Sequence, residues 1–257
     1  GFVSLYEKDV KPKLKLNTWL TKESIIKKKI LPYFGKRKLS EITAKDVMDW
    51  QNEIRSLTDS KGKPYSSTYL KTVHNQLSAL FNHAVKYYGL QSNPAAKAGN
   101  MGSEERKEML FWTKEEYLKF AEAMMDKPIS YYAFEMLYWC GIREGELLAL
   151  SASDFDFENS TVSIRKSYQR LKGQDVITNP KTPKSNRVIK MPQFLCEEMQ
   201  DYIRMFYSPD KEERIFPISK HYLHSEMDRG CKETGVKRIR IHDLRHSHIS
   251  LLIDMGF

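Results

Sequence analysis

The sequence is poor in cysteine and has no long apolar run. Its three cysteines, Cys140, Cys196 and Cys231, are odd in number and far apart, which excludes a disulfide framework or a Cys-x-x-Cys zinc site and predicts a reducing, cytoplasmic location. The longest apolar candidate, "YYAFEMLYWCGI", is shorter than the ~18 residues of a membrane span and is interrupted by Glu135. No charged and apolar leader follows Gly1, so we expect a trimmed chain without a secretory signal.

Positive charge is concentrated in the first part of the chain. The net charge is +9, yet residues 1–100 hold 18 Lys and Arg against 8 Asp and Glu, whereas the remainder holds 24 against 25. This asymmetry suggests one module that binds a polyanion and a second, balanced module with another task. A Lys-rich solvated surface is the alternative interpretation of the same charges.

The basic part has the apolar spacing of a small helical domain. Apolar residues recur at helical intervals over residues 19–31, 47–57 and 70–84, which predicts three helices. We assign these helices to a domain of residues 1–98, followed by a polar linker over residues 99–110.

The third predicted helix also has a polar face. Lys71, Asn75 and Ser78 follow one another at helical spacing, opposite the apolar stripe. We therefore expect this helix to lie in a DNA groove and these three side chains to contact DNA.

Residues 111–257 form the second predicted domain. Thr113 and Glu116 have the spacing of a capping box at the start of a helix. The segments "STVSIRKS" and "SNRVIKMP" carry β-branched residues in alternation and predict a small antiparallel sheet, with the turn-rich "RLKGQDVITNPKTPK" between them. Helical patterns resume over residues 192–207, 219–234 and 242–255. The predicted fold class is mainly α with a small antiparallel β-sheet.

The motif "HDLRH" has two chemical interpretations. His242 and His246 have the spacing of the zinc-protease motif His-Glu-x-x-His. Asp243 stands where that motif has Glu, and the cationic Arg245 lies among the candidate ligands, which disfavours a metal site. His242 and Arg245 share a helix face, and a guanidinium that donates two parallel hydrogen bonds suits a phosphate. The phosphate interpretation needs a further cation elsewhere in the chain.

Arg143 supplies that cation, after a glycine break in "WCGIREGELLAL". Together, "CGIREGEL" and "HDLRH" resemble the signatures Thr-Gly-x-Arg-x-x-Glu-Leu and His-x-x-Arg of the tyrosine recombinase (phage-type integrase) family, in the family's order. Segments such as "ILPYFGKRKLSEITAKDVMDW", "NHAVKYYGLQSNPA" and "LSASDFDFENSTVSI" are most similar to integrases of conjugative transposons. The resemblance covers nearly the whole chain and implies a helical core-binding domain followed by a mixed α/β catalytic domain.

The resemblance also assigns roles to residues. Glu146 orients the first arginine, and a Lys on a turn of the small sheet is Lys181 or Lys184, of which Lys181 is preferred because it precedes the turn. The resulting catalytic set is Arg143, Lys181, His242 and Arg245. Fixed cations stabilise the charge that develops on the phosphate oxygens, and a Lys can protonate the departing 5′ oxygen. This scheme needs no metal, ATP or other cofactor.

The sequence departs from the family pattern in two places. Cys140 replaces the usual Thr before Gly141. The family's nucleophilic Tyr, preceded by a further His or Trp, normally lies beyond the His-x-x-Arg motif, whereas here no Tyr follows Tyr222 and the sequence stops at Phe257. We therefore expect a fragment that binds DNA without cleaving it.

The implied function is site-specific recombination of a mobile element, including integration and transposition, through a 3′-phosphotyrosyl intermediate. The implied partner is double-stranded DNA, with a tetramer on two duplexes in the complete protein. A non-catalytic architectural DNA-binding protein would also explain the basic domain and the missing Tyr. Further alternatives are a zinc hydrolase using His242 and His246 and, among transesterifying enzymes, a type IB topoisomerase that only relaxes DNA.

Overall fold

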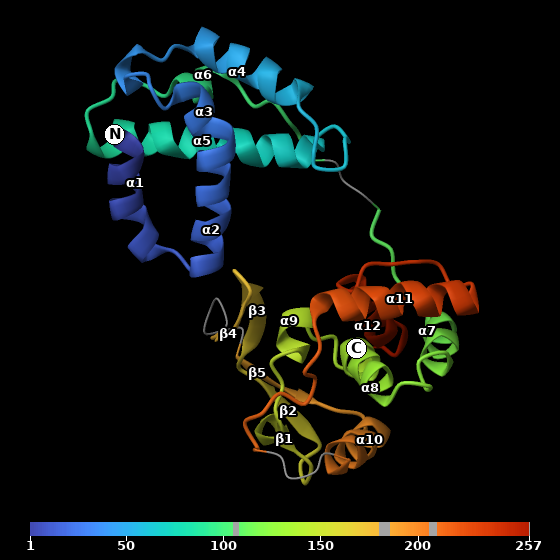
Figure 1. Ribbon diagram of the computed structural model, residues 1–257. Helices are drawn as coiled ribbons and strands as arrows, with labels where there is room; N and C mark the ends of the chain where they lie inside the picture. The colour runs from blue at the N-terminus through green and yellow to red at the C-terminus, as the bar shows by residue number, and fades with distance from the viewer. Residues whose placement is uncertain (105–107, 180–185, 206–209, 257) are drawn as a thin grey trace. The chain divides into compact units, whose positions relative to one another are not determined.

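The chain folds into two compact units, residues 1–107 and 108–257 (Figure 1). The computed structural model describes residues 1–104, 108–179, 186–205 and 210–256. Each unit buries its own cluster of apolar side chains. Two separate cores are the expected organisation of two domains.

The first unit is helical. Its elements are α1 (Phe2–Val10), η1 (Lys11–Lys13), α2 (Leu16–Ile25), η2 (Ile26–Ile30), α3 (Leu31–Phe34), η3 (Leu39–Glu41), α4 (Ala44–Ser56), α5 (Ser67–Tyr87) and α6 (Pro94–Ala98). The three predicted helices are confirmed as the run from α2 to α3, as α4 and as α5. Periodicity does not reveal α1, in which Tyr6 alone is buried, or α6, which is little longer than one turn.

The core of the first unit lies where α4 and α5 pack together. Val47 and Trp50 of α4 and Phe81 of α5 are fully buried. The Trp50 indole nitrogen donates a hydrogen bond to the Lys29 carbonyl at 2.8 Å. The indole is thus buried without leaving an unpaired donor, which would be costly.

Residues 93–104 pack against α4 and α5. Met101 is buried, and the Gly99 carbonyl accepts a hydrogen bond from Gln51 Nε2 at 2.7 Å. Gly102 lies so close to α5 that an added Cβ atom would be 2.1 Å from the Ser67 carbonyl oxygen. Residues 99–104 of the predicted linker are therefore a packed part of the first unit.

The second unit combines helices with short strands. Its elements are α7 (Lys114–Glu122), α8 (Pro128–Trp139), α9 (Glu144–Leu147), η4 (Ala152–Asp154), β1 (Phe155–Asp156), β2 (Thr161–Ile164), β3 (Ser167–Leu171), β4 (Gln174–Thr178), β5 (Arg187–Lys190), α10 (Gln193–Arg204), α11 (Lys220–Thr234) and α12 (Asp243–Asp254). The predicted capping box of Thr113 and Glu116 is present at the start of α7. In the described parts of the chain, every helix is too short or too polar to cross a bilayer.

The strands form two small antiparallel sheets. The first has the order β1-β2-β5, so the predicted pairing of "STVSIRKS" with "SNRVIKMP" is confirmed. The second is a β3–β4 hairpin that begins at Ser167 and extends into the segment that the sequence suggested to be turns. Lys172 and Gly173 both have positive φ, as a two-residue type I′ hairpin turn requires.

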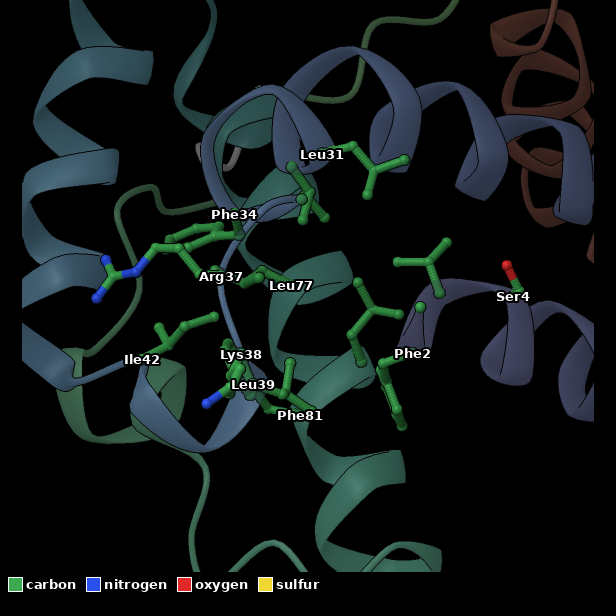
Figure 2. A pocket seen from close by; sticks show the side chains of 15 residues that line it. Phe2, Ser4, Leu31, Phe34, Arg37, Lys38, Leu39, Ile42, Leu77 and Phe81 are labelled. Atoms are coloured by element: carbon green, nitrogen blue, oxygen red, sulfur yellow. The ribbon is translucent and has the colours of Figure 1, made fainter.

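A hollow of about 590 Å³ opens in the first unit between α1, α3 and α5 (Figure 2). Apolar side chains such as Leu31, Phe34 and Phe81 line it, and the Arg37 side chain extends away from them. Arg37 forms an ion pair with Asp46 at 2.8 Å. None of the predicted site residues lines this hollow, so the candidate chemistry lies elsewhere.

Candidate active site

Arg143 stands at the start of α9, just after a tight turn that leaves α8. Gly141 in this turn has a φ of +57°, which favours glycine. The neighbouring Cys140 is buried, and burial raises the pKa of its thiol to about 12. The thiol therefore stays neutral and packs as a small apolar group, so the replacement of Thr by Cys adds no reactive group here.

Glu146 fixes Arg143 at its backbone and at its side chain. The Glu146 carboxylate accepts hydrogen bonds from the Arg143 backbone N–H and from Nη1, each at 2.9 Å. The Glu146 side chain is 6% exposed and that of Arg143 is 51% exposed. Among the described residues, no hydrogen bond engages Nε or Nη2 of Arg143, so this edge of the guanidinium can bind an anion.

Helix α12 brings Arg245 to the same turn. Nη1 of Arg245 donates a hydrogen bond to the Gly141 carbonyl. His248 packs against Gly141 so closely that a Cβ atom there would lie 2.4 Å from His248 Cδ2. The two signature segments are therefore in direct contact.

Arg187 of β5 is a member of the site that the motifs did not reveal. Its Nη2 and Nη1 bind Glu146 Oε2 and Oε1 at 2.7 and 3.1 Å. The strand pattern held a usable signal, because alternation places Arg187 on the same strand face as the core-packed Ile189. An arginine on the inward face of a strand needs an anionic partner, and Glu146 is that partner.

Three arginines, Arg143, Arg187 and Arg245, lie close enough to interact electrostatically with one another and with Glu146. Burial lowers the pKa of Arg245, and repulsion by the charges of Arg143 and Arg187 lowers it further. Arg245 nevertheless stays charged at neutral pH. Burial raises the pKa of Glu146, but the hydrogen bonds from Arg187 and Arg143 outweigh this and hold it below its usual range. One carboxylate thus faces three guanidinium groups, which leaves an excess of positive charge for a bound phosphate.

His242 lies beside these cations at the start of α12. Burial lowers the pKa of His242, and the neighbouring His246, Arg143 and Arg245 add to this effect. The imidazole is therefore neutral at neutral pH, where one ring nitrogen can donate a hydrogen bond to a phosphate oxygen.

The structure brings four of the predicted residues together and leaves the others apart. Lys181 and Lys184 lie outside the described residues. Lys71, Asn75 and Ser78 lie in the first unit on α5, and the four that meet in the second unit are Arg143, Glu146, His242 and Arg245.

The α5 face holds part of the segment of residues 93–104. Lys71 forms an ion pair with Glu104 at 3.0 Å, and Asn75 Oδ1 accepts a hydrogen bond from Asn100 at 2.8 Å. Ser78 accepts through its hydroxyl oxygen and its carbonyl from Asn93. The three side chains share a face as predicted, while their contact with DNA stays a prediction.

The described residues do not support the zinc alternative. The rings of His242 and His246 lie 5.4 Å apart, edge to face. Across the described ranges, no group of three His, Cys, Asp or Glu side chains is placed to hold a metal ion. A structural or catalytic zinc site needs at least three protein ligands.

Comparison with known sequences matches both units. The family described as "Phage integrase family" matches residues 110–257, and the "Phage integrase, N-terminal SAM-like domain" matches residues 1–55. The ICEBs1 integrase of Bacillus subtilis (strain 168) is 28% identical over 268 residues, which cover 99% of this chain and 71% of that protein. The integrase of Mycobacterium phage D29 is 26% identical over 90% of this chain and 61% of its own length.

Comparison with solved structures matches the fold. The Tn1549 transposon integrase (residues 82–397) in complex with circular intermediate DNA aligns with a TM-score of 0.76 at 20% identity, over 100% of this chain and 87% of that one. A lambda integrase (residues 75–356) dimer bound to a COC′ core site aligns with a TM-score of 0.69 at 20% identity, over 99% and 89%. The arrangement of helices around a small sheet is therefore that of these integrases.

Proposed function

The chain belongs to the phage integrase family, and we propose on that basis that it is the DNA-binding and phosphate-activating part of a site-specific tyrosine recombinase of a mobile element. Its substrate is double-stranded DNA that carries the element's recombination sites, which it meets in the cytoplasm. The first unit is the core-binding domain and the second unit carries the transesterification site. Because the chain spans 61 and 71% of the two relatives, other parts of the gene product contribute to the reaction.

The observation that carries this proposal is the meeting of Arg143, His242 and Arg245 around one turn. Arg143 and Arg245, from two distant segments of the sequence, bind Glu146 and the Gly141 carbonyl, and His242 lies close enough for both to lower its pKa, although no ordinary packing requirement brings so much positive charge together. Like charges in contact destabilise a fold unless an anion compensates them. A DNA phosphate is the anion that suits this cluster.

The cluster performs the electrostatic part of the reaction. Attack on a phosphodiester adds negative charge to the non-bridging oxygens, so fixed cations stabilise the transition state more than the ground state. Arg143 presents Nε and Nη2, while Arg245 and the neutral His242 supply further donors. Lys181, which lies outside the described residues, is the general acid in this proposal and protonates the departing 5′ oxygen.

A tyrosine hydroxyl is the nucleophile in this scheme. It displaces the 5′ oxygen, forms a 3′-phosphotyrosyl bond and is later released when a 5′ hydroxyl of another strand attacks. Residues 246–257 contain no Tyr. Tyr222 is unsuited because its hydroxyl is hydrogen bonded to Ser130 at 2.8 Å, next to the buried Glu226. In this proposal the nucleophile is a Tyr outside residues 1–257, and these residues bind DNA without cleaving it.

The complete protein works as a tetramer on two duplexes. The fold match to integrases supports this assembly, because the matching structures include a Tn1549 integrase bound to DNA and a lambda integrase tetramer bound to a Holliday junction. Residues 1–257 by themselves are expected to bind one duplex at a time.

Covalent trapping tests this function. The full-length gene product is incubated with a nicked duplex carrying the element's end, on which cleavage cannot be reversed, and adducts that survive denaturation are counted. We expect an adduct with the full-length product and none with residues 1–257, which should still shift the duplex in a gel. No adduct from a folded full-length product on its own ends would contradict the recombinase function and favour an architectural protein. With a supercoiled plasmid as substrate, relaxation without strand exchange would favour a topoisomerase.

A further inference from the structure

Arg187 and Arg143 bind the same carboxylate, but they use different numbers of guanidinium nitrogens to do so. Arg187 places both terminal nitrogens on Glu146, at 2.7 and 3.1 Å, and its side chain is 25% exposed. Arg143 places only Nη1 of its guanidinium there and is 51% exposed. Arg187 is thus tied to the protein, whereas Arg143 keeps an edge for the phosphate.

We propose that Arg187 is a positioning residue of the phosphate site, which holds the Glu146 carboxylate and thereby directs the open edge of Arg143 at the DNA. This inference rests on the proposed function. Arg187 itself does not bind the scissile phosphate, because its terminal nitrogens already form a two-point ion pair with Glu146.

Strand pairing fixes the backbone position of Arg187. Strand β5 is paired with β2, and Arg187 stands opposite the buried Ile164. Two residues later, Ile189 packs on the core of the unit. An arginine held by a paired strand loses little further freedom when it binds a carboxylate, so it fixes that carboxylate in space.

Helix α9 needs such an anchor because it is only four residues long. Its Gly145 lies against β3, where an added Cβ atom would be 2.7 Å from Ser167 Oγ. Glu146 follows directly and is the residue through which α9 is linked to β5. The pair of Arg187 and Glu146 therefore connects the first signature segment to the sheet.

Arg187 also keeps Glu146 ionised. Burial opposes the charge of Glu146, and the hydrogen bond from Arg187 is the largest effect that favours the anion. The other charged groups that face Glu146 are Arg143 on its own helix and Arg245 on α12. On α11, Lys220 and His224 face Glu144 and not Glu146. Loss of Arg187 should therefore raise the pKa of Glu146.

The alternative role for Arg187 is an ordinary ion pair that only stabilises the fold. A purely structural pair would change the midpoint of thermal unfolding and the amount of active protein, but not the pH dependence of the reaction rate. A positioning role changes both the rate and its pH dependence, because protonated Glu146 no longer orients Arg143. The pH–rate profile therefore separates the two roles.

The test uses the full-length gene product under single-turnover conditions on the nicked duplex. Arg187→Met is expected to slow adduct formation roughly 10- to 100-fold, the usual result of a small displacement of a reacting group, with duplex affinity within about twofold of wild type. The acid limb of its pH–rate profile should move to higher pH. Glu146→Gln should lack that limb, and the Arg187→Met/Glu146→Gln double variant should be no slower than the slower single variant. Arg204→Gln, which breaks an exposed ion pair on α10, is the matched control.

Arg187→Lys keeps the inference testable if Arg187→Met fails to fold. It retains one cation and should show an intermediate rate and a smaller shift of the acid limb. A folded Arg187 variant with wild-type rate and unchanged pH–rate profile would overturn the positioning role while leaving the proposed function intact. Absence of an adduct with the wild-type protein would overturn the proposed function and this inference with it.

Discussion

Arg245 and Gly141 are joined by a hydrogen bond from a guanidinium nitrogen to a backbone carbonyl, although they lie 104 residues apart in the chain. This contact ties α12 to the turn that leads into Arg143. Because the turn has a positive φ and His248 packs against it, its conformation depends on glycine and on α12 together. The geometry of the first arginine is therefore set in part by the second signature segment.

Gly141→Ala should damage the site more than a comparable glycine substitution. Alanine would have to adopt the same positive φ, which costs about 1–2 kcal/mol, and would also displace the His248 ring. Gly235→Ala is the control, since Gly235 also has a positive φ but no atom lies within 4 Å of an added Cβ. Thermal unfolding of residues 1–257 should show the larger loss for Gly141→Ala. Equal losses for the two variants would show that the His248 contact is unimportant.

Arg143→Ala and Arg245→Ala should each slow strand cleavage by about 10²–10³-fold, the usual result of removing one preorganised donor. Duplex affinity should change far less, because the affinity is spread over many phosphate contacts. Single-turnover adduct formation by the full-length product, with Arg204→Ala as the exposed-arginine control, measures the effect. An equal loss of affinity and rate would instead make these arginines ground-state binding residues.

Sequence motifs locate Arg143, Glu146 and Arg245 but not Arg187, which binds the same carboxylate from the sheet. Arg143 and Arg245 belong to short sequence motifs, so each can be recognised from a few neighbouring residues. The contact of Arg187 with Glu146 depends on the register of β5 against β2, which the residues next to Arg187 in the sequence do not reveal. Only the alternation along β5 hinted that Arg187 faces inward.

The β3–β4 hairpin could not be predicted from the sequence for a different reason. Its segment is rich in polar residues and contains Gly173, so the sequence suggests turns, and β4 has no fully buried residue. The hairpin is stabilised by backbone pairing and by local contacts such as that of the Tyr168 hydroxyl with Asp175 at 2.7 Å. Hydrophobic alternation cannot detect a strand that buries so little.

DNA binding by residues 1–257 should tighten as the pH falls below about 6.5, the ordinary pKa of His. Burial and neighbouring cations lower the pKa of His242 in the free protein. A phosphate beside the ring would raise it again, so the complex takes up a proton and is favoured at lower pH. Fluorescence anisotropy from pH 5.5 to 8 measures this. His242→Gln should flatten the curve, whereas His83→Gln in the first unit should leave it unchanged.

The α5 face can be tested through the pair of Lys71 and Glu104. If Lys71 contacts a phosphate, Lys71→Ala should weaken duplex binding and reduce the slope of log affinity against log salt by about 1. Glu104→Gln should strengthen binding by no more than about fivefold, because it removes an exposed competing carboxylate. Lys45→Ala, which breaks an exposed pair with Asp49 on α4, is the control. No change in the salt slope of Lys71→Ala would exclude Lys71 as a phosphate contact.

The contribution of Glu135 to the stability of the second unit should fall as the pH rises from about 5 to 8. This carboxyl of α8 is buried and accepts a hydrogen bond from the Tyr117 hydroxyl at 2.5 Å. Burial raises its pKa from 4.5 to about 7, so the fold favours the neutral acid. The stabilising contribution is fully present below pH 4.5 and is lost as the pH rises through about 7.

The difference between the folded and unfolded pKa corresponds to about 3 kcal/mol at most. Urea unfolding at pH 5, 6.5 and 8 should therefore show a free energy of unfolding that falls for the wild-type chain relative to Glu135→Gln, which keeps an acceptor for Tyr117 but cannot ionise. The lowered pKa values of His242 and His248 act in the opposite direction below about pH 6.5 and are common to both chains. Burial also raises the pKa of Glu198, so a smaller dependence of the free energy of unfolding on pH remains in this variant. An undiminished slope in Glu135→Gln would assign the pH dependence to other groups.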